Sequence, residues 1–356
     1  MGKKKSVVLL TLITIVIVVL CAMIVVPSFE LPFLWNGAVS EWNPVVKTYD
    51  LGADLGGGYY TYYYPEGIIS ETEYKDECES LEDADKLEEY QKSYTRYKET
   101  GLYMSTDPDD GVVEETEGGK YEVKEAFKTA FAAAEKEIAA RYEKKGYSSF
   151  RVSVVDDFAL RVELPVSDTA AATSFNYLAY TGAFTLHDGT KTVFEEGKDV
   201  AAKDYFKSFS PKTSGKSTYV MIKLTKKGQE KIKEITTALA ASSDSSSGST
   251  GGTLSFKVGD NSVIQLTVSE AINEKTLYIG GEDTYTYETA QTVSILLNSA
   301  INAGDLGITF KVDETRTFEA AYGSNALTLL YIALAIVLVA CLVVPVIKYR
   351  GFGGAC

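Results

Sequence analysis

The amino-acid sequence predicts an α+β outer domain between two transmembrane helices. Three observations support this fold class. Two long apolar runs lie near the ends of the 356-residue chain, strand and helix periodicities alternate between them, and a further strand and helix unit follows residue 190. The hydrophobic share of 45% is enough for packed cores, so a wholly disordered chain is excluded.

The first apolar run covers Val7–Val26, and only Thr11 and Thr14 in it are polar. At about 1.5 Å per residue, a helix of this length crosses the roughly 30 Å hydrocarbon layer. The second run, Ala326–Ile347, is uncharged and long enough to span with some tilt. A cleaved signal peptide is the alternative for the first run, but no small-x-small cleavage site follows it. Both runs are therefore expected to anchor the chain in a membrane.

Basic residues lie on the terminal side of both runs, namely Lys3, Lys4, Lys5, Lys348 and Arg350. The positive-inside tendency therefore predicts a multi-pass protein of the cell membrane with both ends cytoplasmic and residues 28–325 on the outer side. These five flanking bases leave 30 of the 35 Lys and Arg in the outer segment against all 49 acidic residues, a net charge of −19. Such a surface argues against nucleic-acid binding, which needs cations to neutralise phosphates.

The residue inventory limits the chemistry of the outer segment. His187 is the only histidine, so a multi-His metal site is impossible and a Ser-His or Cys-His pair could be built only on this residue. His187 with Asp188 could form a base and its orienting partner, although a lone histidine at a strand end is more often structural. Cys78 is the only cysteine between residues 28 and 325, so no disulfide forms within this segment. We therefore expect no enzyme activity, no cofactor and no metal site.

The first half of the outer segment has the order strand, helix, strand, strand, helix, strand, which is typical of the ferredoxin-like fold. Its clearest helix has apolar residues on one face, and the hairpin after it turns at Asp156-Asp157. The predicted elements are residues 48–64, 122–145, 150–155, 158–165, a short helix to Tyr180, and 183–186. The first connection contains an acidic insertion, residues 66–118, with 18 acids against 5 bases. We interpret it as a solvated excursion, with cation binding or partner docking as the alternatives.

These signals divide the chain into a base with an inserted α+β head. The head contains a predicted strand at 217–224, a helix after Thr225, a flexible Ser/Gly loop at 242–252 and a hairpin within 254–268. The predicted parts are 1–27, the cytoplasmic tip and first transmembrane helix; 28–188, a connector and the ferredoxin-like base with the insertion; 189–284, the head; 285–325, the completion of the base; and 326–356, the second transmembrane helix and cytoplasmic end.

Two local clusters have competing interpretations. The glycine cluster Gly52–Gly58 could cradle phosphate, but it lacks the Lys-Ser/Thr pair of a P-loop and the spacing of an EF-hand loop. We interpret it as a place where two backbones approach closely. The tyrosine cluster of residues 59–64, which includes Tyr60 and Tyr62, could grip extended polypeptide with its aromatic faces. The alternative is a half-buried set of rings on a sheet near the membrane surface.

Several segments, taken in chain order, resemble one family of membrane proteins. These are GADLGGG (52–58), FRVSVVDDFALRVELP (150–165), STYVMIKLTKKGQEKIKEITT (217–237), LSFKVGDNSV (254–263), TAQTVSILLNSAINAGDLGITF (289–310) and ETRTFEAAYG (314–323). Together they resemble SecD, a subunit of the Sec protein translocase. The residues that match its motifs are Gly52, Asp54, Leu55, Gly57, Gly58, Arg316, Thr317 and Gly323.

This sequence also departs from the family pattern. Ala53 stands where the family usually has Leu, Ile301-Asn302 replace Leu-Pro, and Glu319-Ala320 replace Gly-Pro. The insertion 66–118 has no counterpart in the family pattern. The family has six spans, whereas this sequence stops after the second, so it is similar to the first part of a SecD.

The resemblance implies an accessory role in proton-gradient-driven export of preproteins. The implied partners are SecF, the SecYEG translocon, unfolded preprotein and membrane lipid. The head is expected to hold polypeptide on strand 217–224 or hairpin 254–268, near Val220, Ile222 and Phe256, with Tyr60 and Tyr62 as the other candidate contact. The alternative function is a two-span receptor or envelope-binding module without a motor role. An envelope hydrolase is disfavoured because the catalytic residues are missing.

Overall fold

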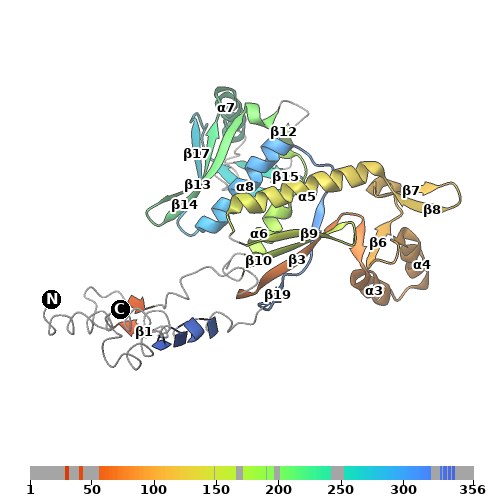
Figure 1. Cartoon of the computed structure of the whole chain (residues 1–356). Helices are drawn as coiled ribbons and strands as arrows, with labels where there is room; N and C mark the ends of the chain where they lie inside the picture. The colour runs from red at the N-terminus through yellow and green to blue at the C-terminus, as the bar shows by residue number, and fades with distance from the viewer. Residues whose placement is uncertain are drawn as a thin grey trace, which may run out of the picture. The chain divides into compact units, whose positions relative to one another are not determined.

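A computed structural model describes residues 29–31, 40–42, 56–147, 149–165, 171–189, 191–195, 201–241 and 252–321, with short helical pieces between 329 and 340. The protein is α+β, as predicted (Figure 1). Its chain divides into two compact units. The smaller unit comprises Met1–Gly58, Pro165–Ser167 and Thr317–Cys356, and the larger comprises Tyr59–Leu164 and Asp168–Arg316.

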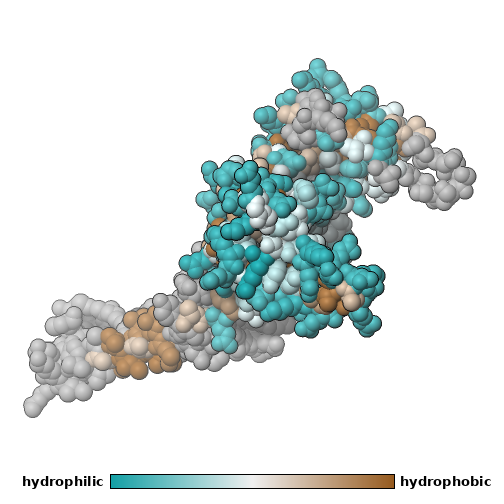
Figure 2. Space-filling model, turned by 90° about the vertical axis from the view of Figure 1, so that its right-hand side faces the viewer, coloured by the Kyte–Doolittle hydropathy of each residue, from teal (hydrophilic) through white to brown (hydrophobic). Residues whose placement is uncertain are grey.

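The described part of the smaller unit is short. Strand β1 (Phe29–Leu31) pairs antiparallel with β2 (Ser40–Trp42). The helical pieces between 329 and 340 present apolar side chains (Figure 2), and Leu329 and Ile336 are each 64% exposed. Among the described residues, no helix has the length and apolar character that a membrane crossing requires. The predicted first span lies outside the described residues, and only these helical pieces of the second span are described.

One sheet of the larger unit has the strand order β18-β3-β10-β9. Its strands are β18 (Phe310–Val312), β3 (Gly58–Pro65), β10 (Ala159–Pro165) and β9 (Arg151–Val155). Side chains alternate between its faces, so Tyr63, Leu160 and Val162 point into a core and are fully buried. Helices α5 (Glu125–Lys145) and α6 (Ala171–Ala179) contribute to that same core, because Phe131, Ile138 and Phe175 belong to it. The predicted helix 122–145 is thus present.

The acidic insertion, residues 66–118, is a folded lobe whose last hairpin extends beyond it to Val123. It has a sheet of order β4-β6-β5, two helices, a 3₁₀ turn and a hairpin. Ser70 and Asp83 cap the two helices by accepting hydrogen bonds from backbone N–H groups, and the rings of Tyr74 and Tyr103 stack 3.8 Å apart. The elements are β4 (Ile68–Ser70), α3 (Glu71–Ser80), α4 (Ala84–Ser93), β5 (Tyr94–Arg96), β6 (Leu102–Ser105), η2 (Pro108–Asp110), β7 (Val113–Thr116) and β8 (Lys120–Val123).

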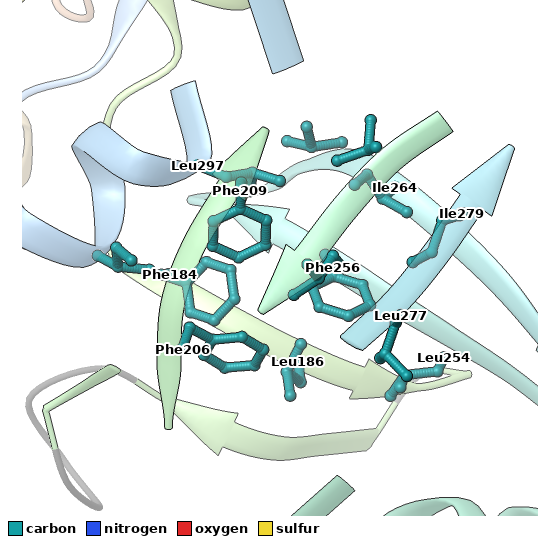
Figure 3. Close-up of a cluster of buried hydrophobic side chains, with 14 of the residues drawn as sticks. Phe184, Leu186, Phe206, Phe209, Leu254, Phe256, Ile264, Leu277, Ile279 and Leu297 are labelled. Carbon is teal, nitrogen blue, oxygen red and sulfur yellow. The ribbon is translucent and has the colours of Figure 1, made fainter. Parts of the chain in front are cut away.

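A second core lies between two further sheets, of orders β12-β11-β15-β16 and β13-β14-β17. Figure 3 shows Phe184, Phe206, Phe209 and Phe256 together in this core. Helices α7 and α8 also contribute to it. The elements are β11 (Phe184–Asp188), β12 (Lys191–Glu195), η3 (Ala202–Asp204), β13 (Phe206–Ser214), β14 (Ser217–Leu224), α7 (Lys226–Ala241), β15 (Gly252–Val258), β16 (Asn261–Val268), β17 (Thr276–Gly281) and α8 (Tyr287–Ala303).

The predicted ferredoxin-like arrangement needs a correction at its last strand. Strand β11 was expected to complete the first sheet, but it pairs antiparallel with β12 and β15 in another sheet. In its register with β12, Asp188 lies opposite Lys191. Phe184 and Leu186 point into the second core, and β18 instead occupies the edge beside β3. The local order of elements did not reveal this long-range pairing.

Helix α8 contributes to both cores and is joined to α5 by buried polar groups. Ile295 belongs to the first core, and Leu296 belongs to the second. Arg141, only 1% exposed, donates hydrogen bonds to the Ser299 Oγ at 2.7 Å and to the Tyr180 carbonyl at 2.6 Å. Burial lowers the pKa of this guanidinium to about 10, against the opposing effect of a nearby carboxylate. The first of these bonds fixes α5 relative to α8, and the second fixes α5 relative to the chain that follows α6.

Candidate functional site

The three head residues predicted to touch polypeptide are in the core. Val220, Ile222 and Phe256 are each fully buried, and Figure 3 shows Phe256 among the other core side chains. Their strands are also central, since β14 lies between β13 and β17, and β15 lies between β11 and β16. In this structure these three side chains cannot contact a client chain, which corrects that prediction. The alternating side chains of β14 point the other way.

The outer face of β14 presents aromatic and thioether groups. Tyr219 and Met221 are half-buried there, and Tyr278 on β17, opposite Met221, is 55% exposed. The rings of Tyr219 and Tyr278 meet edge to face with centroids 6.2 Å apart. We call Tyr219, Met221 and Tyr278 the head patch. Tyrosine offers a large apolar face with little rotamer entropy, and methionine adapts its shape, so this patch can accept varied side chains.

The two edges of this sheet differ. On the β13 edge, the Asn298 side chain of α8 donates to the Phe209 carbonyl at 2.7 Å and accepts from the Phe209 N–H at 3.0 Å. That edge is therefore partly covered by a side chain that mimics a strand. Strand β17 forms the opposite edge of the sheet. An edge strand presents backbone donors and acceptors that another extended chain can pair with.

A second aromatic surface lies on the first sheet, on the face away from α5 and α6. Tyr60, Tyr62 and Tyr64 alternate along β3 and are each half-buried. Tyr60 and Tyr62 meet edge to face at 5.9 Å, and Tyr62 stacks on Tyr64 at 6.0 Å. The Arg161 guanidinium lies 4.5 Å from the Tyr60 ring centre. Burial and the Asp313 charge raise the pKa of Tyr64 to about 12, so its hydroxyl stays protonated at neutral pH.

The glycine cluster and the second motif can be located in part. Gly57 has φ +73°, and a Cβ on it would lie 2.6 Å from the Phe318 carbonyl oxygen, so two backbones approach closely there. Gly58 is buried at the start of β3. Arg316 and Thr317 lie on exposed strand β19 (Arg316–Phe318). Four other predicted motif residues, Gly52, Asp54, Leu55 and Gly323, lie outside the described residues.

The lone histidine lines a cleft of about 850 Å³ within the larger unit. His187 Nε2 lies 3.0 Å from the Thr185 Oγ1. Asp188 is the next residue on the strand, where alternation places neighbouring side chains on opposite faces of the sheet. Among the described residues, no group of three or more His, Cys, Asp or Glu is placed to hold a metal ion.

Strand β17 was not predicted, although the sequence contains a signal for it. Residues 276–281 read TLYIGG, in which Leu277 and Ile279 alternate with Thr276 and Tyr278 before a glycine pair. That pattern is typical of a half-buried strand with a turn after it. Applied to this segment, it would have found the edge strand and its exposed tyrosine.

Comparison with known proteins gave a match only among solved structures. No family model matches the chain, and no curated protein matches it. Three of the solved structures that match are of SecDF. A crystal structure of SecDF in its super-membrane-facing form is 14% identical, with a TM-score of 0.42 and coverage of 95% of this chain and 39% of that one.

Two further SecDF structures have about the same identity and lower TM-scores. One, described as a membrane component that enhances protein export, is 14% identical with a TM-score of 0.32, covering 53% of this chain and 93% of that one. SecDF of Thermus thermophilus, described as a translocon-associated membrane protein, is 13% identical with a TM-score of 0.26, covering 96% and 40%. The chain thus spans about two fifths of the length of two of these three proteins.

Proposed function

We propose that this chain is a SecD-like accessory subunit of the Sec protein translocase, and that its head holds extended polypeptide on strand β17 and the head patch. The observation that supports this contact best is the edge position of β17 beside the exposed Tyr278 and the half-buried Met221. The ordered set of SecD-like segments supports the family assignment. A generic two-span receptor has no reason to share that order.

An extended client would bind β17 as an added strand. Main-chain hydrogen bonds do not depend on client sequence, which suits a protein that handles many preproteins. Each such bond contributes only about 0.5–1.5 kcal/mol net, so a contact along this six-residue strand is weak and reversible. Tyr219, Met221 and Tyr278 would add adaptable apolar contacts to alternate client side chains. Weak binding of this kind allows repeated holding and release.

The remaining parts of the proposal concern energy and partners. Under it, the chain acts with SecF and SecYEG, with residues 28–325 on the outer side and both ends cytoplasmic. Passage of one proton charge through about 100 mV releases roughly 2.3 kcal/mol, which is enough to shift a weak contact between bound and released states. The mechanism needs no covalent step, so the proposal includes no catalytic residue or cofactor.

Site-specific photo-crosslinking of the full chain tests the client contact. A photoreactive amino acid is placed at Tyr278 or Met221, and a slow-moving preprotein is expressed in the same cells. Lys233, an exposed residue on α7, is the matched control. We expect preprotein adducts at positions 278 and 221 that exceed those at 233. Equal adducts at all three positions would exclude the head patch as the client contact.

A second experiment distinguishes loss of the head patch from loss of the fold. Tyr278→Ser and Met221→Ser shorten outward-facing side chains, so the head core stays intact and its thermal unfolding should not change. Export of the slow preprotein should fall in the double variant. An unchanged export rate together with unchanged folding would contradict the proposed role.

A further inference from the structure

One end of the open face of the first sheet combines tyrosines with arginines. Tyr60 and Tyr62 lie there, and the Arg161 guanidinium sits over the Tyr60 ring. Arg316 hydrogen-bonds to Tyr60 through its side chain and is 51% exposed. Arg151, exposed on β9, lies directly across from Glu163 and on the same face as Arg161. We call Tyr60, Tyr62, Arg151, Arg161 and Arg316 the base patch.

The base patch differs from the rest of the domain in charge. The outer segment is strongly acidic, and the insertion lobe alone has 18 acids against 5 bases. At the base patch, three arginines face three carboxylates: Arg161 pairs with Glu163 at 2.8 Å, Arg316 pairs with Asp313 at 3.3 Å, and the exposed Glu314 lines the same hollow as Arg316. An anionic surface would therefore repel the lobe more strongly than this end of the sheet, which would select one orientation of the domain.

The chain connections place this same end close to the predicted membrane anchors. Gly58 begins β3 at the end of the sheet where Tyr60 lies, and the N-terminal anchor precedes it in the sequence. Arg316, bonded to Tyr60, stands ten residues before Ala326, where the second apolar run begins. Ten extended residues reach at most about 35 Å, so the base patch is tethered within that distance of the second span.

We propose that the base patch rests on the phosphate headgroups of an anionic bilayer. Arginine matches phosphate oxygens with a planar pair of N–H donors, and tyrosine rings favour the headgroup region because one end is apolar and the other polar. Docking exchanges the carboxylate partners of the arginines for lipid phosphates. It fixes the base on the membrane and points the acidic lobe away from it. This inference depends on the predicted anchors and is independent of the proposed client contact on the head.

The test uses the full chain reconstituted in vesicles of phosphatidylcholine and phosphatidylglycerol that contain a photoactivatable phosphatidylglycerol. After illumination, mass spectrometry maps lipid adducts along the chain. We expect adducts on the peptides that contain Tyr62 and Arg161, and none above background on those that contain Tyr278. Arg316→Gln should lower the base-patch adducts about fivefold, the effect of one cation near an anionic surface. Vesicles of phosphatidylcholine alone should lower them further.

Two controls distinguish lipid docking from other causes. Lys223→Gln removes an exposed cation from the head and should leave the base-patch adducts unchanged. Tyr62→Ser removes a ring but no charge and should also lower the adducts, while near-ultraviolet circular dichroism verifies the fold. Adducts that are equal on base and head, or insensitive to phosphatidylglycerol, would overturn the proposal. Preprotein adducts at position 62 without lipid adducts would overturn it too and would assign the base patch to polypeptide.

Discussion

A buried pair of tyrosines in the first core gives a prediction with a definite rank order. Tyr63 and Tyr142 are both fully buried, and their hydroxyl oxygens lie 2.6 Å apart. The Tyr63 hydroxyl also lies 2.7 Å from the Phe175 carbonyl. A carbonyl only accepts, so Tyr63 must donate its single proton to it, and Tyr142 must donate to the Tyr63 oxygen.

This direction of donation makes the two Phe variants unequal. Tyr63→Phe removes the bond to the Phe175 carbonyl, worth about 0.5–1.5 kcal/mol, and leaves the buried Tyr142 hydroxyl without its Tyr63 partner, at about 1–3 kcal/mol, so we expect a loss of about 2–4 kcal/mol. Tyr142→Phe leaves the Tyr63 bond to the carbonyl intact and should cost only about 1 kcal/mol. The double variant removes both hydroxyls and leaves no buried hydroxyl unpaired, because the Phe175 carbonyl lies within α6, so it should be no less stable than Tyr63→Phe alone.

Urea unfolding of the full chain in detergent, followed by near-ultraviolet circular dichroism, measures these differences by linear extrapolation. Tyr278→Phe is the matched control, because its side chain is 55% exposed and loss of its hydroxyl should change stability by less than about 0.5 kcal/mol. A Tyr142→Phe variant that loses as much stability as Tyr63→Phe would refute the assigned direction. A double variant whose loss equals the sum of both singles would show that the two hydroxyls are not coupled.

Three further predictions concern pH, backbone geometry and topology. Burial raises the pKa of the Tyr142 phenol above its usual 10. The stabilising contribution of this phenol is therefore complete below about pH 10 and is lost as the pH rises further. The urea midpoint of unfolding should fall less steeply from about pH 8 to 11 in Tyr142→Phe than in the unchanged protein. Gly57→Ala should lower the melting temperature well beyond Gly118→Ala. Both positions have positive φ, but only at Gly57 does the new Cβ meet backbone, at 2.6 Å. Equal losses in melting temperature would exclude a role for the close approach. A membrane-impermeant maleimide should label half-buried Cys78 in intact cells. The Cys78→Ser variant should not be labelled. Labelling of Cys78 only after lysis would place residues 28–325 on the cytoplasmic side of the membrane.

Elements with strong local periodicity were predicted well. The helix expected at 122–145 is α5, and the hairpin around Asp156-Asp157 is β9 and β10. Both turn residues have positive φ, which aspartate tolerates better than most residues. These features depend on neighbours in sequence, so spacing alone was sufficient to locate them.

Features that depend on distant partners were not predictable in the same way. Strand β11 was located, but its hydrogen-bonding partners are β12 and β15, and no local pattern specifies that choice. Strand β13 contains Pro211, which weakens the sequence signal for a strand. The strand forms at the edge of its sheet, where the missing N–H of proline is tolerated.

For a related reason, the candidate contact residues on β14 are buried rather than exposed. The segment TYVMIKL has apolar or aromatic residues on both faces, so alternation alone does not say which set is buried. The core takes the β-branched Val220 and Ile222, whereas Tyr219 and Met221 remain half-exposed. Tyrosine tolerates the outer position because its hydroxyl remains in water, and that preference could have directed the choice.

The packing of α8 constrains where the head can move against the base. A swing of residues 189–284 alone would uncover Val293, Leu296 and Leu297, which are buried against head strands, at about 25 cal/mol for each Å² of apolar area. The seam between α8 and α5 is more polar: Lys145 donates to Glu288 and Thr292, and Arg141 donates to Ser299. Polar groups that separate can bond to water at a small net cost, whereas uncovered apolar area has no such compensation. Any motion of the head is therefore expected to take α8 with it and to open the seam with α5, which makes the Arg141 and Lys145 contacts the ones that such a motion must break.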